Sequence, residues 1–239
     1  MDQEALGLKE IKMKKSAKDI FLYVLMALTA VGISAAAIYY KQSFLLIMPL
    51  YVSIVIGMLQ SRVNRFASML GSVNSIVYGA VYLYYNLYGA AFSAWLFSFP
   101  IQLITFIRWN KNKRGSSTKL RKMTPKMMIL VAVGFCVALV LMWTLLPLLG
   151  AEYVFLDSVT TLLGILIYFL TMFAFVEYPF YMIINGILSI ALYVTMLEES
   201  PETLTYLIFS VYSFICICFA FFEARRLYKA QQEQEVSVC

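Results

Sequence analysis

Two asparagines lie in the middle of long apolar stretches, one in GSVNSIVYGAVYLYY and one in EYPFYMIINGILSIALYV. Asn74 and Asn185 stand 111 residues apart, and each is followed eight residues later by a tyrosine, Tyr82 or Tyr193. An amide in an apolar environment costs free energy unless it is hydrogen-bonded, so each asparagine must face protein or a wet cavity. The chemistry that this pattern offers is hydrogen bonding, either to a neighbouring helix or to a polar solute.

Aromatic and polar side chains near the asparagines extend this chemistry. Tyr178 and Tyr181 precede Asn185 by seven and four residues, a spacing that puts the three side chains on one face of a helix. An aromatic face beside amides suits a flat polar ring, through stacking and hydrogen bonds at the edge of the ring. Gln102 adds two donors and one acceptor, and Thr160 adds a hydroxyl. The candidate binding residues are therefore Asn74, Gln102, Thr160, Tyr178, Tyr181 and Asn185.

Each candidate also has a purely structural interpretation. Asparagine and glutamine commonly hydrogen-bond from one membrane helix to another. Tyrosine near a membrane surface often anchors a helix there, which fits Tyr178 better than the deeper Tyr181. A threonine hydroxyl such as that of Thr160 often bonds back to its own helix. Two amides related by an internal repeat favour a shared central site over the structural interpretation.

The composition indicates an integral membrane protein. Of the 239 residues, 62% are hydrophobic and only 13% are charged, about half the charged share of soluble domains. The chain has no histidine, and its four cysteines form no CxxC pair, which leaves zinc, redox and triad chemistry without support. Asp157 and Glu177 are the remaining acidic candidates for catalysis, and we expect them on opposite faces of the membrane. We therefore expect no enzyme activity, no cofactor and no metal.

Apolar runs of the length that a bilayer requires, roughly 20 residues, predict an all-α integral membrane fold with eight transmembrane helices. With both termini in the cytoplasm, 18 of the 19 lysines and arginines fall on the inner side, as the positive-inside rule demands. This topology and anionic lipid headgroups account for the net charge of +6, so we expect no nucleic-acid partner. The predicted spans are 20–40, 44–59, 67–86, 88–107, 127–148, 157–176, 178–197 and 203–222.

The repeated asparagine and tyrosine predict an internal repeat of three helices. The spans within 44–107 and within 157–222 would form parallel repeats, because the single helix 127–148 between them restores the direction of the chain. The expected architecture is a 3+1+3 bundle with an extra N-terminal helix, in one transmembrane domain, 20–226. Parallel repeats occur in transporters, with the substrate site between the repeats near the middle of the bilayer. The cytoplasmic segments that flank this domain are 1–19 and 227–239.

Charged side chains are absent from the interior of every predicted span. Proton-coupled carriers usually rely on such a residue, so we expect no dedicated proton relay, although sodium held by backbone carbonyls stays open. The sequence favours an uncoupled facilitator, or a weakly coupled carrier, for an uncharged or cationic organic solute.

The chain resembles the PnuC-type vitamin transporter family over residues 44–226. The matching features are the DSVTT that opens the sixth span, the RWNKNK that ends the fourth, and Asn74, Gln102, Glu177, Tyr178, Tyr181 and Asn185. The resemblance implies a 3+1+3 fold like that of the SWEET sugar transporters, usually a homotrimer, in the bacterial inner membrane. It also implies facilitated diffusion of nicotinamide riboside, which a cytoplasmic kinase then traps inside the cell.

Two letters of the resemblance leave the substrate open. In the nicotinamide riboside members, tryptophans usually stand where this sequence has Tyr178 and Tyr181, and a cationic ring stacks more strongly on tryptophan. Deoxynucleosides, thiamine and riboflavin, which relatives carry, are therefore alternative substrates, and a non-transporting membrane receptor is the alternative function. We expect a transporter of nicotinamide riboside or a closely related nucleoside-like vitamin.

Overall fold

Almost every residue that the structure describes lies in a helix. The computed structural model describes residues 2–149 and 153–236. The longer helices are α1 (Asp2–Tyr39), α2 (Phe44–Gln60), α3 (Phe66–Tyr84), α5 (Phe99–Lys111), α6 (Pro125–Leu145), α7 (Val154–Met172), α8 (Tyr178–Met196) and α9 (Leu204–Val236). The shorter elements are α4 (Tyr88–Ser93), a π-helical turn (Ala94–Ser98), β1 (Lys113–Arg114), β2 (Ser117–Thr118) and two 3₁₀ turns (Leu146–Leu149 and Pro201–Thr203).

Seven helical segments of the described chain are long and apolar enough, by length and composition, to cross a membrane. They correspond to all the predicted spans except the second. The helix at that position, α2, is also apolar but has 17 residues. At 1.5 Å per residue such a helix is about 26 Å long, slightly less than the roughly 30 Å of a bilayer's hydrocarbon core.

Two helices extend beyond the predicted spans. α1 begins at Asp2 and runs through the segment predicted as the N-terminal extension, 1–19. α9 continues to Val236 and so includes most of the predicted tail, 227–239. The last three residues of that tail, like the first residue of the chain, lie outside the described residues.

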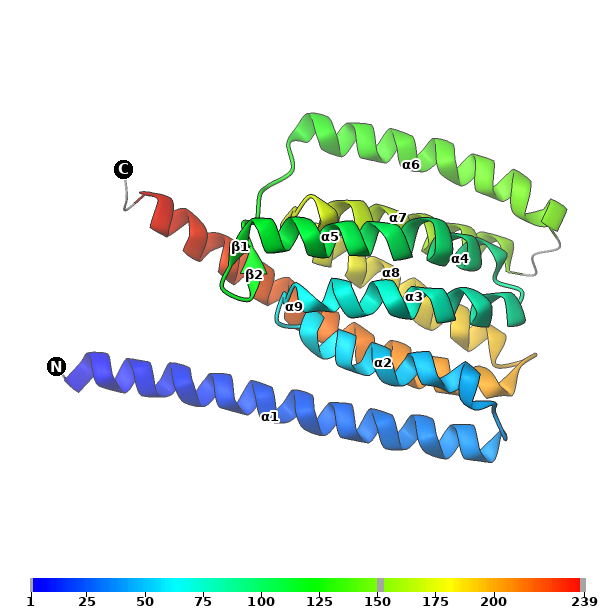
Figure 1. Cartoon of the computed structure of the whole chain (residues 1–239), viewed down its shortest axis with the longest axis horizontal. Coiled ribbons are helices and arrows are strands. Elements are labelled where there is room, and N and C mark those ends of the chain that lie inside the picture. Colours follow the sequence, from blue (N-terminus) through cyan, green and yellow to red (C-terminus); the bar gives the residue numbers. More distant parts are fainter. Residues whose placement is uncertain (1, 150–152, 237–239) are drawn as a thin grey trace.

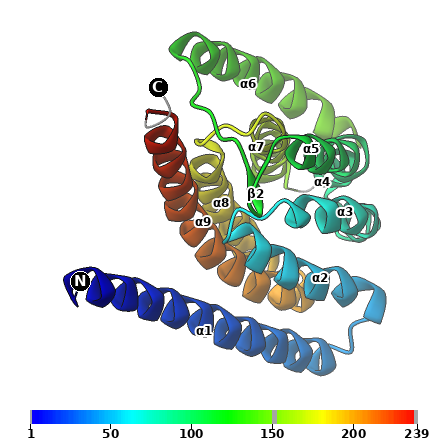
Figure 2. The same cartoon turned by 60° about the vertical axis from the view of Figure 1, so that its left-hand side comes forward.

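The helices form a bundle in which consecutive long helices run in opposite directions (Figure 1). Both ends of the described chain lie at the same end of the bundle as the β1–β2 hairpin. We call this the basic end, because the loop between α5 and α6 carries eight basic residues counted from Arg108 to Lys126, and we call the other end, with Glu198 and Glu199, the acidic end. Figure 2 shows α1 and α6 at opposite edges of the bundle.

Six helices surround the centre of the bundle. α2 and α5 pack on α3, and α7 and α9 pack on α8. Between these two groups, α2 packs on α9 and α5 packs on α7. α6 stays outside this ring: it packs on α7, and none of its residues is buried. A helix that is apolar all round, yet buried by no part of its own chain, suits a lipid-facing position.

The α2–α3 and α7–α8 turns at the basic end have the same backbone conformation. Val63 and Ala174 both have left-handed φ angles, of 51° and 56°. The next amide in each turn, that of Asn64 or Phe175, donates to the carbonyl five residues earlier, as in a Schellman cap. A β-branched residue is uncommon at such a position, and Val63 is held there by complete burial of its side chain. The two turns stand 111 residues apart, which is the spacing of the two asparagines.

The loop between α5 and α6 is fastened to the second half of the chain. The buried Gln231 of α9 donates from Nε2 to Thr118 O (3.0 Å) and accepts from Leu120 N (2.9 Å). Arg121 N donates to Ala174 O at 2.9 Å. These bonds connect the loop to both α9 and the α7–α8 turn, and they explain why the polar C-terminal part of α9 stays helical.

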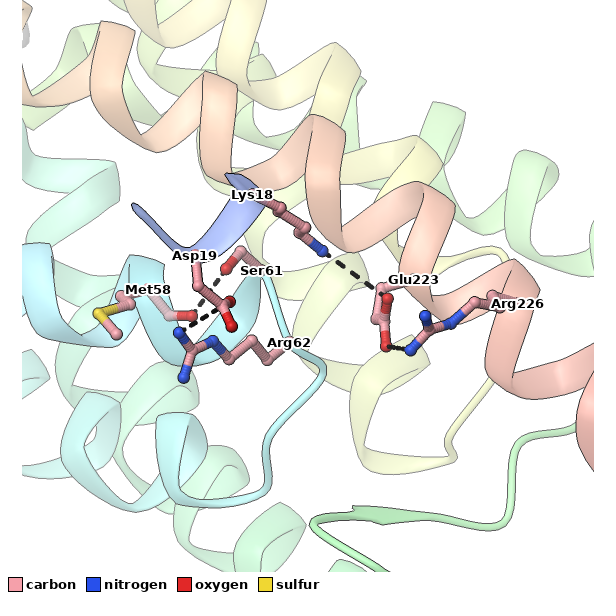
Figure 3. Close-up of polar contacts among 7 residues, drawn as sticks. All are labelled: Lys18, Asp19, Met58, Ser61, Arg62, Glu223 and Arg226. Carbon is pink, nitrogen blue, oxygen red and sulfur yellow. Dashed lines mark hydrogen bonds and ion pairs between the residues drawn. The ribbon is translucent and has the colours of Figure 1, made fainter. Parts of the chain in front are cut away.

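α1 connects the two groups of helices at the basic end through adjacent charged residues (Figure 3). Asp19 Oδ1 pairs with Arg62 at the end of α2 (3.0 Å), and Lys18 Nζ pairs with Glu223 of α9 (3.7 Å). Glu223 also pairs with Arg226 on its own helix at 2.5 Å. α1 packs along both α2 and α9, so it covers the seam between them.

Candidate functional site

A cavity of about 300 Å³ lies at the centre of the six-helix ring, and each of the six helices contributes to its lining. It extends from Asn64 and Trp109 at the basic end to Tyr82 and Tyr193 toward the acidic end. No Asp, Glu, Lys or Arg is among the described residues that line it. Its polar lining consists of amides, hydroxyls and phenols, so it is suited to a solute that needs hydrogen bonds rather than a charge partner.

Asn74 of α3 lies in the wall of this cavity with both amide hydrogens in use. Its side chain is 4% exposed, and Nδ2 donates to Pro49 O (2.9 Å) and Ser53 Oγ (2.8 Å) of α2. Ser53 in turn donates to the Tyr78 hydroxyl at 2.9 Å. Oδ1 of Asn74 is buried and has no hydrogen-bond partner. Asn74 therefore acts both as a link between two helices and as an unsatisfied acceptor.

Gln102 of α5 is held in a similar way by two serines. Its Nε2 donates to Ser98 Oγ (2.6 Å) and Ser75 Oγ (3.2 Å), and these two hydroxyls lie 2.5 Å apart. Ser98 is the last residue of the π-helical turn between α4 and α5. π-helical turns inside α-helices occur frequently at functional sites, and here the turn ends on the serine that anchors the amide.

Gly71 gives Gln102 the room to lie against α3. A Cβ at position 71 would stand 1.9 Å from Gln102 Oε1 and 2.9 Å from its Cδ. Overpacking of this kind costs about 1–3 kcal/mol, so Gly71→Ala is expected to lower the thermal melting temperature of the purified protein. Gly134→Ala on α6, where a Cβ meets nothing within 4 Å, is the matched control and should melt like wild type. Truncation in Gly71→Ala/Gln102→Ala should recover part of the loss; no recovery would place the clash elsewhere.

Asn185 of α8 contributes a second unsatisfied acceptor to the same cavity. Its Oδ1 is buried without a hydrogen-bond partner. It lies one residue before Gly186, where a Cβ would come within 3.2 Å of Phe214 on α9. The structure thus brings together four of the six predicted residues, namely Asn74, Gln102, Tyr178 and Asn185.

The two predicted tyrosines have different positions. Tyr178 lines the cavity at the basic end, where its ring packs edge-on against Trp109 at 6.5 Å between centroids. Trp109 Nε1 donates to Thr171 O at 2.9 Å, which fixes the indole between α5 and α7. Tyr181 is not among the lining residues, and its ring contacts Phe180 at 5.7 Å. The prediction that Tyr181 shares a cavity-facing surface with Asn185 is therefore not met by the geometry.

Thr160 lies in a second, smaller cavity of about 120 Å³ on the acidic side of the first. The two cavities share wall residues, among them Asn185, Tyr82 and Tyr193. The Thr160 hydroxyl donates to Leu156 O on its own helix at 2.7 Å. This is the back-bonding arrangement that the sequence offered as the structural interpretation, and it leaves the hydroxyl proton committed.

Several aromatic residues of the cavity were not predicted as candidates. Tyr82 and Tyr193, which belong to the repeated pattern, are hydrogen-bonded to each other through their hydroxyls. Tyr78 stacks on Tyr82 at 5.4 Å. The sequence did contain a signal for Tyr78, because it follows Asn74 by four residues and so shares its helix face. The unpredicted aromatic and tyrosine lining is Tyr78, Tyr82, Trp109, Tyr168, Tyr193, Tyr206 and Phe209.

The two acidic candidates have structural partners at opposite ends of the bundle. Asp157 of α7 is 1% exposed, and its carboxyl oxygens accept from Gly89 N (2.9 Å), Ala90 N (3.1 Å) and Thr161 Oγ1 (3.1 Å). It thereby caps the first turn of α4. Glu177 accepts from Met123 N at the basic end. Among the described residues, no group of three or more Cys, Asp or Glu side chains could hold a metal.

Comparisons with known proteins agree with this geometry. The family model described as "Nicotinamide mononucleotide transporter" matches residues 43–223, about three quarters of the chain. A solved structure titled "Crystal structure of the Vitamin B3 transporter PnuC" has the same fold, with a TM-score of 0.75 and 20% identity over 89% of this chain and 92% of that one. No curated protein matches the chain. The matched span contains all six helices of the ring, and the chain belongs to the PnuC-type nicotinamide mononucleotide transporter family.

Proposed function

We propose that this protein carries nicotinamide riboside, or a closely related nucleoside-like vitamin, across the bacterial inner membrane by facilitated diffusion. The observation that carries the proposal is a cavity of nucleoside size, lined by aromatic rings and hydrogen-bond acceptors, without a charged side chain among its described lining residues. Small-molecule sites typically combine apolar and aromatic walls with a few oriented polar groups.

The acceptors favour a ligand rich in hydrogen-bond donors. Asn74 and Asn185 each have a buried, unpartnered amide oxygen, and both hydrogens of Gln102 Nε2 are taken by serines. A riboside supplies hydroxyl donors, and a carboxamide supplies an NH₂ group. The negative ends of the amide dipoles and the tyrosine faces also suit the positive charge of a pyridinium ring.

The lack of basic lining residues favours the nucleoside over the nucleotide. A phosphate taken out of water needs cationic or multiple N–H partners, because a buried unpaired charge is costly. The described lining offers no Lys or Arg. We therefore propose the riboside as the substrate, although the family description names the mononucleotide.

The proposed route across the membrane is alternating access between two three-helix repeats, within eight spans that include α2. The spacing of 111 residues supports this, since it relates the Val63 and Ala174 turns as well as the two asparagines. Under this repeat, α2, α3 and α4–α5 correspond to α7, α8 and α9. The basic end would face the cytoplasm, with both termini there, and the family resemblance adds a homotrimer.

Uptake into proteoliposomes tests the proposed function. Labelled nicotinamide riboside should enter saturably, should equilibrate without a sodium or proton gradient, and should be displaced by excess unlabelled riboside but not by the mononucleotide. Deoxynucleosides, thiamine and riboflavin belong in the competitor panel, because Tyr178 stands where tryptophan is usual. Equal uptake of the mononucleotide would contradict the proposed substrate. Binding without uptake of any panel member would favour the receptor instead.

A further inference from the structure

We infer that three serines, Ser53, Ser75 and Ser98, set the hydrogen-bond polarity of the cavity and thereby determine which ligands it admits. The inference rests on the proposed function and goes beyond it, because none of the three serines was a predicted binding residue. Each serine contacts an amide rather than standing alone in the wall. They are positioning residues, which act on the ligand through Asn74 and Gln102.

Ser53 fixes the orientation of the Asn74 amide. With Ser53 Oγ and Pro49 O as acceptors at 2.8 and 2.9 Å, both hydrogens of Nδ2 point to α2. Rotating the amide by half a turn would place Oδ1 against two groups, one of which, a backbone carbonyl, can only accept. The observed orientation is therefore the satisfied one, and it leaves Oδ1 as the group with no partner in the protein.

Ser75 and Ser98 fix Gln102 by the same principle. Their hydroxyls accept from the two hydrogens of Nε2 at 3.2 and 2.6 Å, while a bond between the two serines uses one of their own protons. The amide nitrogen therefore has no hydrogen left for a ligand. Gln102 can offer only its carbonyl oxygen, which lies over Gly71.

The consequence is a cavity that accepts hydrogen bonds but whose two fixed amides donate none. A ligand carboxamide can donate to such a wall. A carboxylate of nearly the same shape cannot donate, and it would meet amide oxygens with its own negative charge. Removing a serine leaves part of the NH₂ group unpaired and allows the amide to turn, which exposes an N–H donor to the ligand. The serines thus reject acceptor-only ligands by holding the donors away from them.

Two ribosides of matched size test this inference, nicotinamide riboside and nicotinic acid riboside, in which a carboxylate replaces the carboxamide. Dissociation constants are measured by titration calorimetry on the purified wild-type protein and on Ser53→Ala, Ser75→Ala and Ser98→Ala. We expect wild type to prefer the amide by about 100-fold, roughly one lost hydrogen bond and one uncompensated charge. Ser53→Ala and Ser98→Ala should each reduce this preference about tenfold, chiefly by tighter binding of the acid.

Matched controls separate positioning from general damage. Ser210 also lines the cavity, but its hydroxyl bonds to Tyr206 O on its own helix, so Ser210→Ala should keep the wild-type preference. Ser98→Thr retains the hydroxyl and should restore the preference that Ser98→Ala loses. Serine variants that weaken both ribosides equally, or that leave the preference unchanged, would overturn the inference while the proposed function stands. A wild-type protein that binds neither riboside would overturn both.

Discussion

Replacing Asn74 and Asn185 together by alanine lowers the uptake of nicotinamide riboside into proteoliposomes by about 100-fold, if each amide oxygen accepts one hydrogen bond from the substrate. Both oxygens are buried without a partner in the protein, so a ligand that donates to them removes an existing penalty as well as gaining a bond. Such a bond is worth about 1–1.5 kcal/mol, close to tenfold in affinity per residue. The single variants should therefore each lose about tenfold.

Two comparisons keep this result interpretable. Asn110 is exposed at the end of α5, and Asn110→Ala should transport at the wild-type rate. Asn185→Ala removes an amide for which the structure gives no hydrogen bond to another residue, whereas Asn74→Ala also breaks the bonds to Pro49 and Ser53. A melting curve for each variant shows whether folding is intact. Wild-type uptake by the double variant would refute a central role for the two amides.

Asp157→Ala should destabilise the protein more than any other single change considered for this chain. The substitution leaves the buried Gly89 and Ala90 amides without an acceptor and frees the Thr161 hydroxyl. A buried donor that loses its partner costs about 1–3 kcal/mol, so the total is about 2–4 kcal/mol. For a chain of this length that corresponds to a melting temperature lower by roughly 5–15 °C, measured on the purified protein in detergent.

Asp157→Asn keeps one carbonyl acceptor and should lose about half as much. Glu198 is exposed at the acidic end, so Glu198→Ala should melt like wild type. If Asp157→Ala melted at the wild-type temperature but lost transport, the carboxyl group would have a role in the transport cycle rather than in capping α4.

The positions of the helices could be predicted because apolar length is encoded locally. The second span was expected at 44–59 and α2 covers Phe44–Gln60. The π-helical turn at Ala94–Ser98 could not be predicted in the same way, since an apolar run reads alike for an α- and a π-helical turn. The sixth span begins three residues earlier than expected, at Val154, because Asp157 lies inside the helix and is satisfied by a distant part of the chain.

The cavity residues were harder to predict than the helices, for a geometric reason. Spacing identified neighbours of Asn185 on its helix, but it could not tell on which side of the asparagine the cavity lies. At about 100° per residue, Asn185 stands at one border of the cavity-facing stripe of α8, with Tyr193 within the stripe and Tyr181 beyond the border. Asn74 has the same border position on α3, with Tyr78 and Tyr82 inside the stripe. Only the packing of α8 against its neighbours decides which side is open.

The seam between α2 and α9 is fastened unequally along its length, and this gives the bundle a direction in which it yields. Toward the acidic end, buried phenols bond directly across the seam, Tyr206 to Leu46 O and Tyr212 to Ile54 O. At the basic end the two helices are joined through the partly exposed ion pairs of α1 (Figure 3). Such pairs contribute about 0–1 kcal/mol and weaken with ionic strength. The seam thus resembles a hinge at one end and a salt-sensitive latch at the other.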